Sequence, residues 1–148
     1  MSLRRILVAV DGSDVSFNAS NYAMDLAKTN GAELIALHVI YPTYSQYEAV
    51  LSPRPERLQE VTRKEMEERQ QYVDKVKQQA TEKKVIVKTD IIVGITSVVK
   101  EIVEYAENNN VDIIVVGSRG MTGFKRMLLG SVASDIVTYS HCPVLVVK

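Results

Sequence analysis

The chain has 148 residues, 46% of them hydrophobic and 24% charged, which is the balance of an ordinary globular protein. Its formal net charge is zero and it has no basic block, which argues against a protein dedicated to nucleic-acid binding. Its single cysteine, Cys142, excludes an intrachain disulfide. The first apolar run, 6–10, is too short for a signal peptide or a membrane span. We therefore expect one cytoplasmic domain over residues 1–148, without membrane contact.

The first half of the chain alternates strand-like and helix-like segments. Continuous apolar runs at 6–10 and 34–40 predict strands that are covered on both faces. Between them, apolar residues from Ala19 to Ala27 recur at helical spacing. The segment 41–55 contains three prolines and is predicted to be a long surface loop. A long charged helix is predicted over 56–83, with its charges on a solvated face.

The second half continues the same alternation. A third strand is predicted at 85–93, and because Lys88 and Asp90 interrupt its apolar character, we place it at an edge of the sheet. The remaining predicted elements are a helix at 98–106, a strand at 113–116, a helix at 132–139 and a strand at 144–147. This alternation predicts an α/β fold, a parallel sheet with helices on both faces.

Two predicted strands end in unusual turns. The first strand is followed by Asp11-Gly12-Ser13, and the fourth by a glycine-rich segment, 117–123. In open parallel sheets, ligands bind outside the carboxyl ends of the strands, where the strand order reverses. If these two strands are neighbours at the reversal, the two turns face one crevice.

The glycines in this region suit the binding of an anion. Gly117 and Gly120 can form a concave turn in which backbone N–H groups approach a phosphate that a β-carbon would keep away. Gly130 precedes the last helix and Ser131 suits its N-cap, where free N–H groups and the helix dipole favour an anion. The alternative is that these glycines serve only turns and a helix cap.

Other candidate residues have two interpretations each. Arg119, Lys125 and Arg126 can pair with phosphate charge or remain solvated loop cations. Asp11 can contact a ligand or cap a turn. His38, among apolar residues, is predicted to be a hydrogen-bonded structural histidine rather than a catalyst. The sequence has no Walker pattern, no nucleophile elbow and no zinc-ligand cluster.

The spacing Gly117-x2-Gly120-x9-Gly130-Ser131 resembles the nucleotide-binding signature of the universal stress protein family. The resemblance covers the whole chain, including the segments 6–13, 37–39 and 143–147. It implies a single Rossmann-like domain with a five-stranded parallel sheet in the order 3-2-1-4-5, which makes the first and fourth strands neighbours.

The resemblance also implies a ligand, ATP or another adenine nucleotide, with Mg or Mn held by the phosphates. Asp11 would contact the ribose or the metal–phosphate region, and the main chain at Val39 would hold adenine. The candidate binding residues are Ala9, Val10, Asp11, Val39, Gly117, Arg119, Gly120, Gly130, Ser131 and Val132. No residue is assigned as catalytic or as a metal ligand. A homodimer through the last strand is implied, and it would cover an apolar edge strand.

Three functional hypotheses follow. The first is a nucleotide-regulated signalling or binding module in the stress response, acting on an unidentified protein partner and hydrolysing ATP slowly at most. The second is a slow ATPase or phosphotransferase built on Asp11 and a metal ion. The third is a dimeric scaffold that binds no nucleotide.

Overall fold

The computed structural model describes residues 2–41, 55–94, 96–119 and 129–148. In the helix that begins at residue 55, side chains are described from residue 63 onward. The strands are β1 (Arg5–Ala9), β2 (Glu33–Ile40), β3 (Val87–Val93), β4 (Ile113–Gly117) and β5 (Val144–Val147). They form one five-stranded sheet in the order β3-β2-β1-β4-β5, and every pairing is parallel. The predicted fold and strand order are confirmed.

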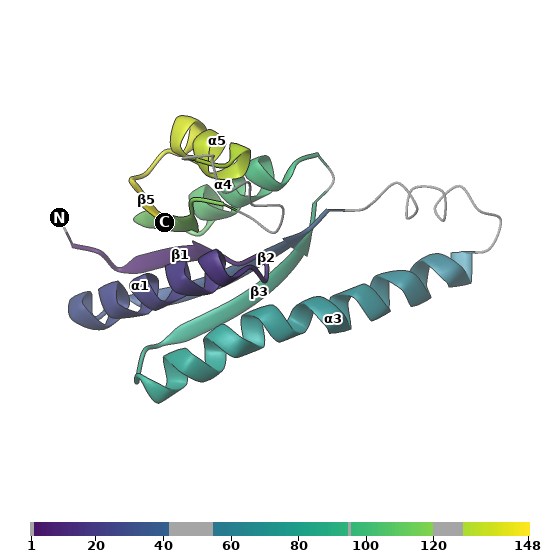
Figure 1. Ribbon diagram of the computed structural model, residues 1–148, viewed down its shortest axis with the longest axis horizontal. Helices are drawn as coiled ribbons and strands as arrows, with labels where there is room; N and C mark the ends of the chain where they lie inside the picture. The colour runs from purple at the N-terminus through teal and green to yellow at the C-terminus, as the bar shows by residue number, and fades with distance from the viewer. Residues whose placement is uncertain (1, 42–54, 95, 120–128) are drawn as a thin grey trace.

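The helices of the described part cover both faces of the sheet (Figure 1). They are α1 (Asp14–Asn30), α3 (Pro55–Glu82), α4 (Val98–Asn108) and α5 (Ser131–Tyr139). Small and apolar side chains of α1 and α3 pack with one set of alternating strand residues, such as Val8 and Ala36. Those of α4 and α5 pack with the other set, such as Leu7 and Ile114. The alternation of side chains along each buried strand thus produces two cores, one in each layer.

The central position of β1 determines which turns meet. Its neighbours are β2 and β4, with Ile6 in register with Leu34 on one side and Ile113 on the other. The turn after β1 therefore lies between the ends of β2 and β4. This is the adjacency that the candidate crevice requires.

The start of α1 is fixed by the turn that follows β1. Ser13 is the N-cap, and its hydroxyl accepts a hydrogen bond from the backbone N–H of Ser16 at 3.2 Å. The Asp11 carboxylate Oδ1 in turn accepts from the backbone N–H of Ser13 at 2.9 Å and from its hydroxyl at 2.5 Å. These bonds satisfy donors at the helix start, and they hold Asp11 in place.

The predicted edge strand is confirmed as β3, although its start differs from the prediction. Lys84 has a left-handed backbone (φ 59), and Val85 donates its N–H to the Ala80 carbonyl, so the chain joins the sheet only at Val87. Asp90 accepts a hydrogen bond from the Tyr105 hydroxyl of α4 at 3.0 Å. Burial, followed by this contact with Asp90, raises the pKa of Tyr105. A polar residue in the strand is thereby paired with the helix above it.

The helix α3 is longer than the sheet it covers. Its C-terminal half packs on the sheet through Val73, Val76 and Ala80, which are fully buried, and its N-terminal half extends past the carboxyl ends of the strands (Figure 1). Most of the predicted loop, 42–54, lies outside the described residues. In the part of the chain that is described, no helix combines the length and apolar character needed to cross a membrane.

Candidate functional site

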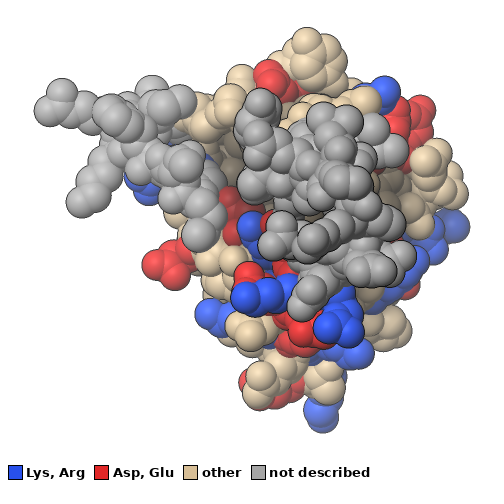
Figure 2. Space-filling view, turned by 90° about the vertical axis from the view of Figure 1, so that its right-hand side faces the viewer, with Lys and Arg blue, Asp and Glu red and all other residues tan. Residues whose placement is uncertain are grey.

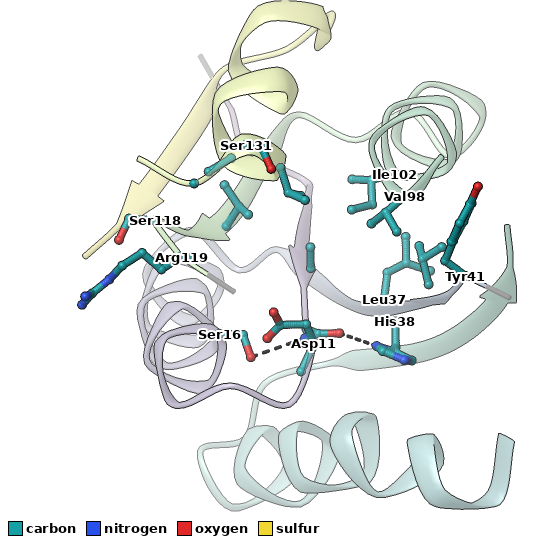
Figure 3. Close-up of a pocket in the computed structure, with 18 of the residues that line it drawn as sticks. Asp11, Ser16, Leu37, His38, Tyr41, Val98, Ile102, Ser118, Arg119 and Ser131 are labelled. Atoms are coloured by element: carbon teal, nitrogen blue, oxygen red, sulfur yellow. Dashed lines mark hydrogen bonds between the residues drawn. The ribbon is translucent and has the colours of Figure 1, made fainter. Parts of the chain in front are cut away.

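A cavity of about 540 Å³ opens at the carboxyl edge of the sheet. The ends of β1, β2 and β4 form its floor, and the starts of α4 and α5 form part of its wall (Figure 3). Of the predicted binding residues, the structure brings these together around the cavity: Ala9, Val10, Asp11, Val39, Gly117, Arg119, Gly130, Ser131 and Val132. Gly120, with Lys125 and Arg126, lies outside the described residues. Two turns far apart in the sequence therefore share one crevice.

One end of the cavity is apolar. Leu37 of β2 faces Val98 and Ile102 of α4, and Tyr41 stands at the rim (Figure 3). Val39 of β2 lines the same cavity. Such a slot, with backbone groups of a strand end beside it, suits a flat heteroaromatic ring. The sequence pattern marked Val98 and Ile102 only as part of an apolar helix face, because helical spacing does not distinguish a core contact from a cavity wall.

The other end of the cavity is polar. Asp11, Ser16 and Ser131 lie around it, and α5 begins there (Figure 3). The N-terminus of α5 adds the positive end of a helix dipole and N–H groups that have no partner within the helix. This end suits hydroxyl groups and an anion.

The prediction that Ser131 is the N-cap of the last helix is wrong. The cap is Gly130, which has an extended backbone (φ −68, ψ 160) and makes no side-chain cap bond, while Ser131 is the first helical residue. The Gly130 carbonyl accepts the N–H of Ser134 at 2.9 Å, and the Gly130 N–H donates to the Ser118 carbonyl at 2.6 Å. The Ser131 hydroxyl is consequently not used in capping.

Gly117 was predicted to form part of the turn. It is instead the last residue of β4. A β-carbon there would lie 2.8 Å from Cγ1 of Val15 on α1. This glycine therefore has a packing reason, the close approach of α1 to the strand end. At Gly130, by contrast, the nearest atom of the described residues to an added β-carbon would be the Ser118 carbonyl oxygen, at 3.1 Å, and the next would lie at 3.6 Å.

Two arginines among the described residues line the cavity, and only one of them was a sequence candidate. Arg119 extends away from Asp11 and Ser131 (Figure 3). Arg69, from the middle of α3, lines the same cavity. It was missed because a charged helix has the pattern of a solvated face, and nothing in that pattern shows that α3 overhangs the crevice.

His38 is a hydrogen-bonded structural histidine, as predicted. Its side chain is buried, and its Nδ1 lies 2.6 Å from the Val10 carbonyl oxygen. Nδ1 is thus the protonated nitrogen of the neutral ring, and Nε2 has no hydrogen-bond partner among the described residues. Burial lowers the pKa of His38 below its ordinary value of 6.5, and the charge of Arg69 acts in the same direction. The Val10 carbonyl and the carboxylates of Asp11 and Glu65 act in the opposite direction.

This shift predicts a pH dependence of stability. Since the unfolded chain takes up the His38 proton at a higher pH than the folded chain, the free energy of unfolding should fall as the pH drops below about 6.5. Urea denaturation between about pH 5.5 and 7.5 measures this slope, and His38→Gln should flatten it. His141→Gln, at an exposed position, is the matched control. Equal slopes for wild type and His38→Gln would contradict the prediction.

Comparison with known proteins gives the family. The family model described as "Universal stress protein family" matches residues 2–148. The universal stress protein MJ0531 of Methanocaldococcus jannaschii is 39% identical over 98% of this chain and 82% of its own length. The solved structure of MJ0577, from the same organism, has a TM-score of 0.85 and 34% identity, with 100% of this chain and 97% of that chain covered.

A further family structure, a universal stress protein in complex with cAMP, has a TM-score of 0.72 and is 24% identical, over 100% of this chain and 99% of that one. This likeness concerns the fold. The matched family model agrees with the observed strand order and with the glycine spacing of the sequence. The chain belongs to the universal stress protein family.

Proposed function

We propose that this chain is an ATP-binding universal stress protein, a nucleotide-regulated binding module whose state is passed to a protein partner. The observation that carries the proposal is the division of one cavity into an apolar slot between β2 and α4 and a polar end at the start of α5. An adenine nucleotide has the same division, a flat base at one end and an anion at the other. The family structure with cAMP contains such a nucleotide.

The residues of the cavity fit the proposed ligand in a definite order. The base would lie between Leu37 and Ile102, with the main chain at Val39 beside it. The ribose would lie near Asp11, whose Oδ1 is held by Ser13. The phosphates would lie at Gly130 and the start of α5. Mg or Mn would be held by the phosphates; the described residues contain no group of three or more His, Cys, Asp or Glu side chains suited to a metal ion.

The proposal includes slow hydrolysis at most. Rapid phosphoryl transfer needs a group that orients water and others that stabilise developing charge. Asp11 is the carboxylate that lines the cavity in the described part of the chain, and its Oδ1 is engaged by Ser13. A turnover number above about 1 per second would favour the alternative of an ATPase or phosphotransferase.

The direct test is calorimetric titration of protein freed from bound nucleotide with ATP and magnesium. A saturable site with one ATP per chain supports the proposal. No binding of ATP, ADP, AMP or cAMP would contradict it and would leave the nucleotide-independent scaffold as the better hypothesis.

We also propose that the protein forms a homodimer through β5. This strand is at an edge of the sheet and is only partly buried except at Val147. On the neighbouring helix, Val137 and Tyr139 are exposed. Pairing with a second copy would satisfy the open edge and cover apolar surface. Sedimentation as a monomer across a wide concentration range would contradict this.

A further inference from the structure

Arg69 reaches the cavity from a helix that has no place in the glycine signature. Its side chain is 35% exposed and lines the cavity together with Asp11 and His38. It belongs to the part of α3 that lies near the carboxyl edge of the sheet, one turn before the helix becomes fully buried at Val73 (Figure 1). A guanidinium at this position is close to a bound ligand and still open to solvent.

The position of Arg69 is fixed by the ring of Tyr72. The Arg69 guanidinium carbon lies 5.8 Å from the centroid of that ring. The ring packs directly on Gly12, where an added β-carbon would lie 2.5 Å from its Cζ atom. Its edge also meets the His38 ring, with centroids 5.3 Å apart. Tyr72 therefore rests on the turn after β1 and on the end of β2, and it holds the guanidinium beside both.

Arg69 and Asp11 bring opposite charges to the same strand ends. Both charges act on the His38 ring, where Arg69 lowers the pKa of His38 and Asp11 raises it. The ring is itself joined to the residue before Asp11, because its Nδ1 lies 2.6 Å from the Val10 carbonyl oxygen (Figure 3). In the proposed binding mode this is the region of the ribose, whereas the phosphates lie at the start of α5.

Both groups have capacity for a ligand. The recorded hydrogen bonds of the Asp11 carboxylate within the described residues use Oδ1, at 2.9 and 2.5 Å from the N–H and hydroxyl of Ser13, which leaves Oδ2. Arg69 has a recorded ion pair with Glu65, through a single Nη2–Oε1 contact of 3.4 Å. That contact uses one of the five N–H groups of a guanidinium and is long for a charge-assisted hydrogen bond.

A pair of neighbouring hydroxyl groups is the chemistry that fits a carboxylate and a guanidinium together. Each hydroxyl donates one hydrogen bond and accepts others, so the carboxylate can take the protons while the guanidinium donates to the oxygens. A site built in this way rejects an analogue without the hydroxyls, because its own polar groups are then left unpaired. The ribose of a nucleotide carries such a pair, its 2′ and 3′ hydroxyls.

The surrounding charges favour a contact role for Arg69 over a long-range one. On the face that includes the carboxyl edge, acidic and basic side chains are mixed over the described surface (Figure 2). Arg69 is therefore not part of a broad positive field that would attract anions from a distance. Its effect on a ligand depends on the hydrogen bonds that its own N–H groups make.

We infer that Arg69 is a ribose-recognition residue, which reads the 2′,3′-diol together with Asp11 and makes the site favour nucleotides that carry both hydroxyls. This inference rests on the proposed function and extends it, because it adds a ligand contact from α3, outside the glycine signature. The contact concerns the sugar, so the binding of base and phosphates does not depend on it.

The test is the affinity of wild type, Arg69→Met and Arg69→Lys for magnesium ATP and magnesium 2′,3′-dideoxy-ATP, measured by calorimetry. The two nucleotides have the same base and the same phosphates, so the ratio of their affinities isolates the hydroxyls. Wild type should bind ATP about 30-fold or more tightly than dideoxy-ATP. Arg69→Met, which removes the donors but keeps a long unbranched side chain, should weaken ATP by about ten-fold and dideoxy-ATP by less than about three-fold.

Two further variants complete the design. Arg69→Lys keeps the charge but loses the planar fork, so its ratio should fall between those of wild type and Arg69→Met. Arg63→Met is the matched control and should keep the wild-type ratio, because Arg63 is exposed on the same helix and does not line the cavity. Circular dichroism shows whether each variant retains its helices; if Arg69→Met does not, the ratio for Arg69→Lys decides.

An unchanged ratio in the Arg69 variants overturns the inference. Equal losses for the two nucleotides would mean that Arg69 acts through the position of α3 or on a part of the ligand that both share. Equal affinities of wild type for ATP and dideoxy-ATP would also overturn it, because the hydroxyls would then not be read. If wild type binds neither nucleotide, the proposed function fails, which is distinct from wild type binding both.

Discussion

Replacing Gly130 by valine should greatly weaken ATP binding while the protein stays folded. The backbone at Gly130 is extended (φ −68, ψ 160), a conformation that valine adopts readily, so no backbone strain is expected. The new β-carbon would lie 3.1 Å from the Ser118 carbonyl oxygen, the atom that accepts the Gly130 N–H. The side chain therefore displaces the turn at Gly130, where the phosphates are proposed to lie.

We expect Gly130→Val to weaken ATP by at least about 100-fold, or roughly 2.7 kcal/mol of binding free energy. Gly130→Ala should give an intermediate loss, because it adds the same β-carbon without the branched methyl groups. Calorimetric titration measures both, with circular dichroism as the check on folding. Gly31→Ala should bind as wild type does, because Gly31 does not line the cavity and no described atom lies within 4 Å of an added β-carbon. Full affinity in Gly130→Val would remove the phosphates from this turn.

The second large effect is on stability, and it concerns Gly12. This residue has a φ of +87, and an added β-carbon would lie 2.5, 2.6 and 2.9 Å from ring atoms of Tyr72. Gly12→Ala should therefore combine the cost of a left-handed alanine with that of displacing a packed ring. We expect the free energy of unfolding to fall by about 2–5 kcal/mol in urea denaturation.

The chain offers a control that separates the two costs. Gly31 also has a positive φ, +62, but no atom of the described residues lies within 4 Å of an added β-carbon there. Gly31→Ala should accordingly lose only about 1–2 kcal/mol, the backbone part alone. Tyr72→Ala should recover part of the loss when combined with Gly12→Ala, because the clash disappears. Strictly additive effects in this double-mutant cycle would show that Tyr72 does not press on the turn.

The helices and strands could be predicted because packing against the two core layers determines the spacing of apolar residues and the length of each apolar run. Continuous apolar runs such as 34–40 occur because β2 is covered on both faces. Lys88 and Asp90 marked the edge strand correctly, because a strand at the edge of the sheet is less covered and tolerates charged side chains. The order of the strands came from the family resemblance, because no local pattern states which strand lies beside which.

The failures at the site have physical causes. Glycine and serine are both good N-cap residues, so the sequence Gly130-Ser131 did not show which of the two is the N-cap of α5. At position 117 a glycine is needed because Val15 of α1 packs closely on it, and this contact depends on the tertiary structure. Arg69 was missed because its place in the cavity lining depends on where α3 lies over the sheet. The sequence singled out cavity-lining residues that lie in the chain's own turns, whereas it did not single out those brought in from another layer.

The central place of β1 has a consequence for how the chain reaches its native state. Arg5, at the start of β1, bonds through its backbone N–H to Asp112, which is 107 positions later in the sequence. Such non-local contacts incur the entropy of closing a long loop before they return any stability, which slows folding. During synthesis, β1 can pair with β2 early, but its other edge stays open until β4 has emerged. The crevice forms only when the two halves of the chain join, so nucleotide capture would report that folding is complete.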